Sequence, residues 1–196
     1  MDRKKALENK NSAKTLTELQ NLHADLFSAF KTQFNRSLPF TDEVFDRWER
    51  AKDLGWGKGS SVYDSAYIFG ETEVGENTWV GPFTIIDGSG GLTIGDNCTI
   101  SSGVHIYTHS NLKQTLSGGK LPIEREAVKI GSCTYIAPQS ILGMGISIGD
   151  HCVVAANSFV SQSFPDFSII AGNPAKIIGR VVITEDDISF DYSNNG

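Results

Sequence analysis

The sequence predicts a mainly β chain in which a triangular coil of short parallel strands follows an N-terminal α-helical segment. Three observations predict it: a six-residue period of aliphatic residues, a glycine content of 20 in 196 residues, and a helical apolar period confined to residues 1–58. Glycine at about 10% exceeds the usual ~7% and suits a chain with many tight turns.

The helical segment carries 11 basic and 9 acidic side chains, a net charge of +2. Leucines and phenylalanines recur at spacings of three and four between Leu16 and Phe30, which predicts a helix with one apolar stripe. Ser37, Leu38 and Pro39 end this pattern. We expect the helices of this segment to cover one end of the main domain.

A second helix is predicted after this break. Thr41 is expected to cap its start, and Val44, Phe45 and Trp48 are expected on its buried face. Gly55 is expected to end it, because glycine readily adopts the conformation that closes a helix.

The period of six begins after residue 58. Fourteen positions at this spacing hold Ile, Leu or Val, with one two-residue slip at 87–91 and one long insertion at 107–127. The positions are Val62, Ile68, Val74, Val80, Ile86, Ile94, Ile100, Ile106, Ile130, Ile136, Leu142, Ile148, Val154 and Val160. Chance explains this series poorly, since these residue types make up roughly a fifth of the chain.

Each repeat predicts a short strand, a corner and one inward aliphatic side chain. Glycine or alanine commonly follows the aliphatic residue, where glycine would tolerate a positive φ. Three repeats then make one turn of about eighteen residues, with strands stacked ~4.8 Å apart. The fourteen repeats predict between four and five turns within residues 59–180, a protruding loop at 107–127, and a tail at 181–196.

Composition excludes several classes of protein. The net charge of −6, from 17 basic and 23 acidic residues, argues against nucleic acid or an anionic membrane as a partner. The polar start and the absence of a long apolar run predict a cytoplasmic protein without membrane insertion. Cys98, Cys133 and Cys152 lack the spacing of a disulfide framework or a metal site, so we expect no metal. Cys98 and Cys152 occupy inward positions and are expected to fill the core.

The six basic residues after residue 58 gather at the loop and at the C-terminal exit of the coil. They are Lys113, Lys120, Arg125, Lys129, Lys176 and Arg180. An acidic domain with its cations at two places is suited to a phosphorylated ligand such as coenzyme A. The alternative is that loops and ends simply collect solvated lysines.

Several motifs carry a resemblance to a known family. They are Leu92–Asn97, Gly103–His109, Val128–Gly131, Ile146–Asp150 and Ile170–Lys176. With them, residues 60–180 resemble the hexapeptide-repeat acyltransferases, and most closely the maltose and galactoside O-acetyltransferases and the polysaccharide and O-antigen acetyltransferases. The resemblance implies a left-handed parallel β-helix, a homotrimer with active sites in clefts between neighbouring prisms, and acetyl-CoA as the acyl donor.

The resemblance assigns the catalytic base to His109 in the 107–127 loop. An imidazole, with an ordinary pKa near 6.5, can accept the proton of a hydroxyl that attacks a thioester. The oxyanion that forms needs an N–H donor, which the family supplies near the position of Pro138. Proline has no N–H, so a neighbouring amide must serve here or the geometry differs.

The resemblance also implies the residues that bind coenzyme A and the acceptor. The residues expected to bind coenzyme A are Tyr135, Ala137, Ala156, Ser161, Lys176 and Arg180. Arg180 is included because of its positive charge at the C-terminal exit of the coil. Gln162 stands where a lysine is common, which removes one expected phosphate contact. Those expected to bind the acceptor are Asp87, His105 and Tyr107. Asp87 could instead orient the catalytic histidine across the subunit interface, or simply form an Asp-Gly turn. His23 and His151 are expected to be ordinary surface residues.

The function predicted first is an acetyl-CoA-dependent O-acetyltransferase acting on a sugar or polysaccharide precursor. An N-acetyltransferase of an amino sugar, a nucleotide sugar or a xenobiotic is the alternative within the same chemistry. A zinc enzyme like the gamma-class carbonic anhydrases shares the prism, but His105, His109 and His151 do not suggest a three-ligand set, since His151 falls at a corner of the coil. A non-catalytic scaffold is the remaining alternative.

Overall fold

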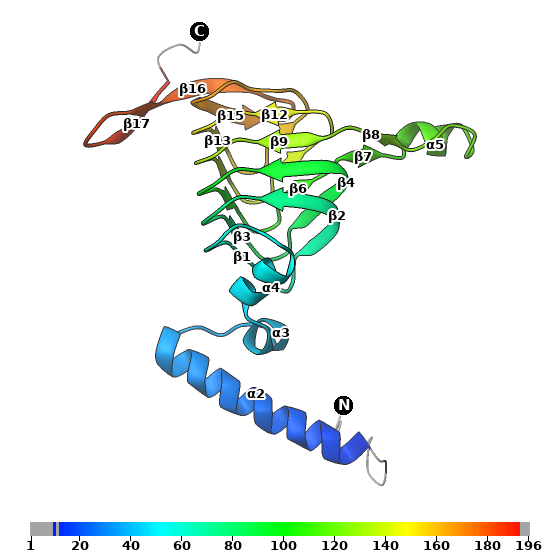
Figure 1. Cartoon of the computed structure of the whole chain (residues 1–196), viewed down its shortest axis with the longest axis vertical. Coiled ribbons are helices and arrows are strands. Elements are labelled where there is room, and N and C mark those ends of the chain that lie inside the picture. The colour runs from blue at the N-terminus through cyan, green and yellow to red at the C-terminus, as the bar shows by residue number, and fades with distance from the viewer. Residues whose placement is uncertain (1–9, 11, 193–196) are drawn as a thin grey trace. The chain divides into compact units, whose positions relative to one another are not determined.

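The computed structural model describes residue 10 and residues 12–192. The chain divides into two compact units, Met1–Asp46 and Arg47–Gly196 (Figure 1). The polar start on which the prediction of location relied lies outside the described residues. Among the described residues, no helix is long and apolar enough to cross a membrane.

In its described residues the first unit holds the helices α2 (Ser12–Phe34) and α3 (Phe40–Val44). No residue of α2 is buried, and Leu19, Leu22 and Phe27 of its apolar stripe are exposed. His23 on α2 lies 3.5 Å from the buried carboxylate of Glu43 on α3, measured from Nε2 to Oε2.

The prediction of the second helix is wrong about where the helix starts and about which residues it buries. Pro39, not Thr41, precedes α3, and the helix stops where Phe45 turns to an extended conformation. A separate helix, α4 (Arg47–Asp53), begins two residues later. Because of this break, Val44, Phe45 and Trp48 are exposed. The predicted end is confirmed, since Gly55 follows α4 with a φ of 75°.

A left-handed parallel β-helix fills most of the second unit, as predicted. Its strands are β1 (Ser61–Val62), β2 (Tyr67–Val74), β3 (Trp79–Val80), β4 (Ile85–Ile94), β5 (Thr99–Ile100), β6 (His105–Ile106), β9 (Val128–Ile130), β10 (Tyr135–Ile136), β11 (Ile141–Leu142), β12 (Ser147–Ile148), β13 (Val153–Val154), β14 (Phe159–Val160) and β15 (Ser168–Gly172). The first face stacks β1, β3, β5, β10, β13 and β15. The second face stacks the starts of β2 and β4 with β6, β11 and β14, and the third stacks their ends with β9 and β12.

The predicted inward ladders form the core. On the first face Val80, Ile100, Ile136 and Val154 are all 0% exposed and pair in parallel register. Each such side chain contributes about 1.5–3 kcal/mol by burial. The prism has about six turns rather than the four to five expected. The additional strand is β15, whose Ile170 pairs with Val154. These two residues are 16 positions apart instead of the 18 of a regular turn, so Ile170 does not fit the six-residue period.

The corners turn for a different reason from the one expected. At one corner, positive φ falls on Gly59 in the first turn and then on residues that are not glycines: Asn77, Asn97, Cys133, His151 and Phe167. The glycines near them are needed because the turns approach closely. A Cβ on Gly131 would lie 2.6 Å from the carbonyl carbon of Gly149. Glycine at these positions therefore permits stacking of the coil.

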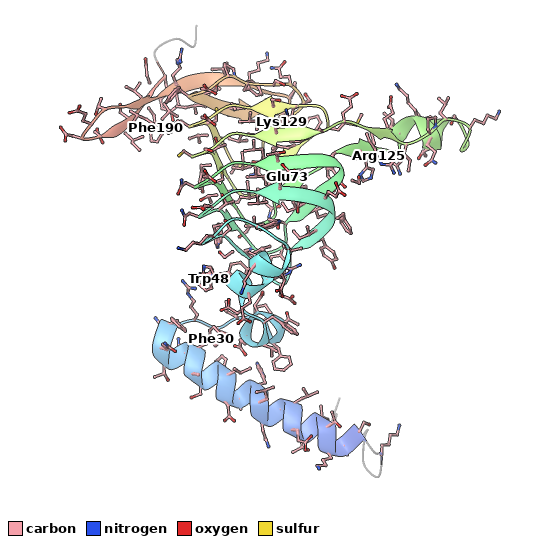
Figure 2. The ribbon with its side chains drawn as sticks, in the orientation of Figure 1. Phe30, Trp48, Glu73, Arg125, Lys129 and Phe190 are labelled. Carbon is pink, nitrogen blue, oxygen red and sulfur yellow. The ribbon has the colours of Figure 1, made fainter. Side chains whose placement is uncertain are left out.

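The outward residues differ between the faces. Third-face strands present polar side chains such as Glu73 and Lys129, both labelled in Figure 2. The second face instead presents a register column that is mostly apolar: Tyr67, Ile85, His105, Ile141 and Phe159. Tyr67, Ile141 and Phe159 are exposed.

A C-terminal hairpin extends the first face. It consists of β16 (Ala175–Ile183), antiparallel to β15, and β17 (Ile188–Asp191), antiparallel to β16. The residues from 181 to 191, expected as a tail, therefore continue the sheet. Phe190 on β17 is exposed (Figure 2).

Candidate active site

The two breaks in the six-residue period meet at one corner of the prism. The slip at 87–91 lies within β4, where the pairing with β2 shifts register between Gly70 and Thr72. The insertion at 107–127 leaves the coil directly after β6, which pairs with β4 through Ile86 and Ile106. Both irregular segments therefore leave the second face side by side, on adjacent turns.

The insertion is an arm that projects from the prism (Figure 1). It is built from β7 (His109–Ser110) and β8 (Glu124–Arg125), which pair antiparallel, and from the short helix α5 (Leu112–Leu116). Lys113 Nζ lies 2.6 Å from Glu124 Oε1. The hydrogen bond to Glu124, together with its charge, raises the pKa of Lys113. His109 thus sits at the root of the arm, where the arm leaves the coil.

His109 is paired with Asp87 of the same chain. Its Nδ1 lies 2.6 Å from Asp87 Oδ2, and its side chain is 38% exposed while that of Asp87 is 2% exposed. Ser89 Oγ lies 3.2 Å from the same ring nitrogen. Of the roles left open for Asp87, this contact matches orientation of the histidine, but it is made within one chain because the slip and the loop leave adjacent turns.

The Asp87 carboxylate is held in its ionised form. Burial alone would raise the pKa of this group, but the hydrogen bonds it accepts from Ser89, Thr108 and His109 outweigh burial. They hold the pKa well below its usual range. The amide N–H groups of Thr108 and Ser89 donate to its two oxygens at 2.8 and 3.0 Å.

This geometry defines the roles of the two imidazole nitrogens. An ionised carboxylate only accepts hydrogen bonds, so Nδ1 must carry the hydrogen that it shares with Asp87. In the neutral ring, Nε2 then holds the lone pair. Since the ring is partly exposed, His109 can act as a base towards a molecule that approaches from solvent.

His105 and Tyr107 form a row with His109. Tyr107 Oη lies 3.3 Å from His105 Nδ1. The Tyr107 ring contacts both imidazoles edge to face, with centroid distances of 5.9 Å to His105 and 6.4 Å to His109. The structure thus brings together the predicted base and the three residues expected to bind the acceptor.

The residues expected to bind coenzyme A are spread over the prism. Tyr135 is exposed on the first face, Ala137 is buried at the next corner, and Ala156 and Ser161 are exposed at two corners. Lys176 and Arg180 are exposed on β16. Within the described part of the chain, no hydrogen bond or ion pair joins any of them to His109.

The structure explains the proline that removes one expected donor. The amides of Ala137 and Gln139, on either side of Pro138, donate to Val154 and Ser102 within the coil. In the neighbouring turns, Ser102 and Ala156 occupy the corner position that Pro138 holds. Their amides make no hydrogen bond with another described residue, so a proline at this position costs the coil no hydrogen bond. Neither neighbour of Pro138 is free to serve, whereas these two amides are.

Sequence reasoning missed Ser89 and Thr108. Both lie inside the two breaks in the period, next to the predicted Asp87 and His109, and that position is the signal that could have found them. Thr108 is fully buried.

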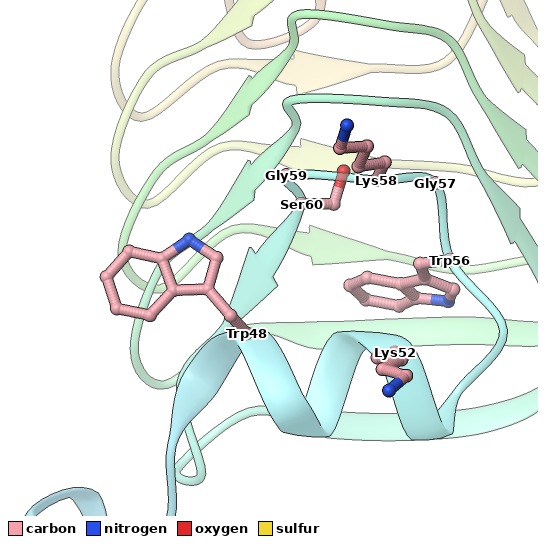
Figure 3. Close-up of a pocket in the computed structure, with 7 residues that line it drawn as sticks. All are labelled: Trp48, Lys52, Trp56, Gly57, Lys58, Gly59 and Ser60. Carbon is pink, nitrogen blue, oxygen red and sulfur yellow. The ribbon is translucent and has the colours of Figure 1, made fainter.

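Other features of the second unit lie apart from this corner. An open pocket of about 410 Å³ is lined by Trp48, Lys52, Trp56 and Lys58 and contains none of the predicted site residues (Figure 3). Burial raises the pKa of the Cys98 and Cys152 thiols, and both side chains lie in the core as expected. No group of three His, Cys, Asp or Glu side chains that could hold a metal occurs among the residues the structure describes.

Comparisons with known proteins agree with the fold. Residues 72–108 and 139–162 match the family model described as the hexapeptide repeat of succinyl-transferase. The chain is 37% identical over 109 residues to serine acetyltransferase 2 of Arabidopsis thaliana, covering 55% of this chain and 32% of that protein. It is 28% identical over 130 residues to the galactoside O-acetyltransferase of Escherichia coli K12, covering 55% and 63%.

Solved structures show the same architecture. A maltose O-acetyltransferase from Clostridium difficile 630 is 25% identical with a TM-score of 0.55, covering 85% of this chain and 88% of that one. An N-acyltransferase from Bacillus cereus, in complex with dTDP and 3-hydroxybutyryl-CoA, is 21% identical with a TM-score of 0.55, covering 68% and 89%.

The fold and the repeat define a left-handed parallel β-helix protein of the hexapeptide class. The resemblance seen in the sequence is confirmed: the chain carries the hexapeptide repeat and is similar to hexapeptide-repeat acyltransferases. The matches span about a third to two thirds of the length of the two curated relatives described.

Proposed function

We propose that the protein is an acetyl-CoA-dependent acetyltransferase in which His109 acts as the general base. The observation that carries this proposal is the 2.6 Å contact between His109 Nδ1 and Asp87 Oδ2, which leaves Nε2 as the basic nitrogen. The acetyltransferases among its relatives support the reaction class.

In the proposed reaction, Nε2 takes the proton of an acceptor hydroxyl as its oxygen attacks the thioester carbonyl. The carbonyl π electrons move onto oxygen, and this oxyanion needs an N–H donor. We assign the donor to the free corner amide of Ser102 or Ala156. When the intermediate collapses, the C–S bond breaks and the imidazolium returns its proton to the thiolate. The products are an acetyl ester and free coenzyme A.

The donor is proposed to lie along the coil. Its contacts are those expected from the sequence: Tyr135, Ala137, Ala156, Ser161, Lys176 and Arg180. Lys176 and Arg180 are exposed on the C-terminal hairpin, where two cations can meet the phosphates of coenzyme A. The structurally similar N-acyltransferase from Bacillus cereus, in complex with an acyl-CoA, supports this class of donor.

The acceptor is proposed to be a hydroxyl of a sugar or polysaccharide precursor. His105 and Tyr107 line the approach to His109, and an aromatic ring beside the base suits the apolar face of a sugar. An amine acceptor is the second candidate, which the Bacillus cereus N-acyltransferase supports. We place this reaction in the cytoplasm.

A homotrimer is proposed, with the second face turned towards a neighbouring subunit. The apolar outward column of this face, which includes Tyr67, Ile141 and Phe159, supports the assignment. The polar third face, which includes Lys129, would remain in solvent. Ile141→Glu should therefore weaken the trimer in analytical ultracentrifugation, whereas Lys129→Glu should leave it intact.

The activity is tested by the release of free thiol from acetyl-CoA in the presence of sugars, nucleotide sugars and amines. Release that depends on a hydroxyl acceptor, with an acetyl ester identified by mass spectrometry, supports O-acetylation. Release only with amines supports the second candidate. If coenzyme A fails to bind in calorimetry, the proposal is wrong and a non-catalytic scaffold replaces it.

A further inference from the structure

Thr108 joins the two irregular segments of the site more completely than any other side chain around Asp87. Its amide N–H donates to Asp87 Oδ2 at 2.8 Å. Its hydroxyl lies 2.9 Å from the main-chain oxygen of Asp87 and 3.1 Å from Oδ2, either of which can accept its hydrogen. The same hydroxyl oxygen accepts the amide N–H of Gly90 at 2.8 Å.

Thr108 differs from the threonines of the regular coil because its hydroxyl also contacts a carboxylate, that of Asp87. The hydroxyls of Thr78 and Thr134 likewise accept an amide N–H and donate to a carbonyl of the next turn, but neither contacts a carboxylate. Thr84, which is equally buried, donates to the carbonyl of Gly81 within its own turn. Thr108 contacts Asp87 and Gly90 of the 87–91 slip from the turn that carries His109. The two segments also approach closely, since a Cβ on Gly90 would lie 2.3 Å from the Thr108 carbonyl oxygen.

From these contacts we infer that Thr108 is a positioning residue, whose hydroxyl holds the Asp87 carboxylate against the His109 imidazole. This inference rests on the proposed function. Without the hydroxyl, Asp87 loses a donor and the partly buried amide of Gly90 loses its acceptor, so the slip is expected to rearrange to satisfy that amide. A displaced carboxylate no longer fixes the hydrogen of His109 on Nδ1.

The consequence is a loss in the chemical step rather than in binding. Thr108 is fully buried, so it does not touch either substrate. A misplaced base lowers kcat, because the proton is transferred only as the bond forms. The KM for acetyl-CoA should change little, since no coenzyme A contact proposed above involves Thr108.

The test compares Thr108→Val, which removes the hydroxyl, with Thr108→Ser, which keeps it. Thr84→Val is the matched control at an equally buried threonine outside the site. We expect Thr108→Val to lower kcat for thiol release by about 10- to 100-fold. Thr108→Ser should stay within a few-fold of the parent protein. Should Thr108→Val fail to fold, Thr108→Ala takes its place, since it differs from Thr108→Ser only by the hydroxyl.

A second readout follows the imidazole itself. The ¹⁵N NMR spectrum of histidine-labelled protein distinguishes an Nδ1–H from an Nε2–H ring, and His109→Asn assigns the signal. We expect the parent and Thr108→Ser to show the Nδ1–H form, and Thr108→Val to show a mixture. Thr84→Val should leave the spectrum unchanged even if it lowers the free energy of unfolding.

Two results would overturn the inference: full kcat in Thr108→Val, or a reduced kcat with an unchanged His109 spectrum. Both differ from failure of the proposed function, in which His109→Asn itself retains thiol release.

Discussion

The regular turns of the prism and its one irregular corner use the same residue types for different purposes. In the regular turns, Asp96 and Asp150 each accept an amide hydrogen bond from the adjacent turn, from Glu76 and Ser132 respectively, both at 2.7 Å. At the irregular corner, Asp87 accepts hydrogen bonds from two amides and from an imidazole. Regular spacing therefore stacks the coil, and the breaks in it create the candidate site.

The largest expected effect is on acetyl transfer, and it distinguishes His109 at the irregular corner from His151 at a regular corner. His109→Asn removes the proposed base and should lower acetyl transfer by about 10²- to 10⁴-fold. His151→Asn, at a regular corner where the ring stacks on Phe167, should retain activity within a few-fold. Asparagine fits there because Asn77 and Asn97 occupy the same corner of other turns. Thiol release measures both, and equal rates for the two variants would contradict the assignment of the base.

The core of the regular turns should respond in stability rather than in chemistry. Ile100→Ala leaves a cavity in a fully buried ladder and should lower the free energy of unfolding by about 2–5 kcal/mol. The outward neighbour Thr99, changed to Ala, should alter it by less than about 0.5 kcal/mol. Urea unfolding followed by circular dichroism measures the difference. Similar losses for both variants would argue against the predicted inward ladder.

Acid should remove a stabilising contribution specific to the irregular corner. Because the pKa of Asp87 is lowered in the folded chain, its contribution is fully present above the unfolded pKa of about 3.9. It is lost as the pH falls from there towards the folded pKa. The free energies of unfolding of the parent and of Asp87→Asn should therefore differ most near neutral pH and converge below about pH 4. A difference that grows in acid would show the opposite linkage.

The smallest effect is expected on the exposed arm. Lys113 pairs with Glu124 on the surface, where an ion pair stabilises little. Lys113→Met should therefore leave Tm almost unchanged in differential scanning calorimetry. A large fall in Tm would show that the arm stabilises the prism.

Much of this architecture could be predicted from the sequence because the repeat is nearly periodic. An inward aliphatic residue every six positions predicts Val62, Ile100 and Val154 in the core, and all are fully buried. The sixth turn was missed because β15 breaks the spacing. The positive φ of Cys133 and His151 was missed because their conformation is imposed by stacking and not by residue type.

The candidate site was harder to predict, since its contacts join residues about twenty positions apart. The sequence predicted His109 as the base through resemblance. For Asp87 it left three roles open: binding the acceptor, orienting the histidine, or forming a turn. The 2.6 Å pairing depends on the register that sets β4 beside β6, which the repeat alone does not define. The Thr108 hydroxyl could be recognised only once the slip and the loop were seen to meet.

The most direct test of the account is a paired measurement on Asp87→Asn and Asp150→Asn. Thiol release from acetyl-CoA is measured for both, beside their free energies of unfolding at neutral pH. We predict that Asp87→Asn loses about 10²-fold or more in kcat while remaining folded. Asp150→Asn should keep its activity within a few-fold, because an amide oxygen still accepts the Ser132 N–H. Equal activity in the two variants would contradict the claim that the break in the repeat, and not the repeat, forms the active site.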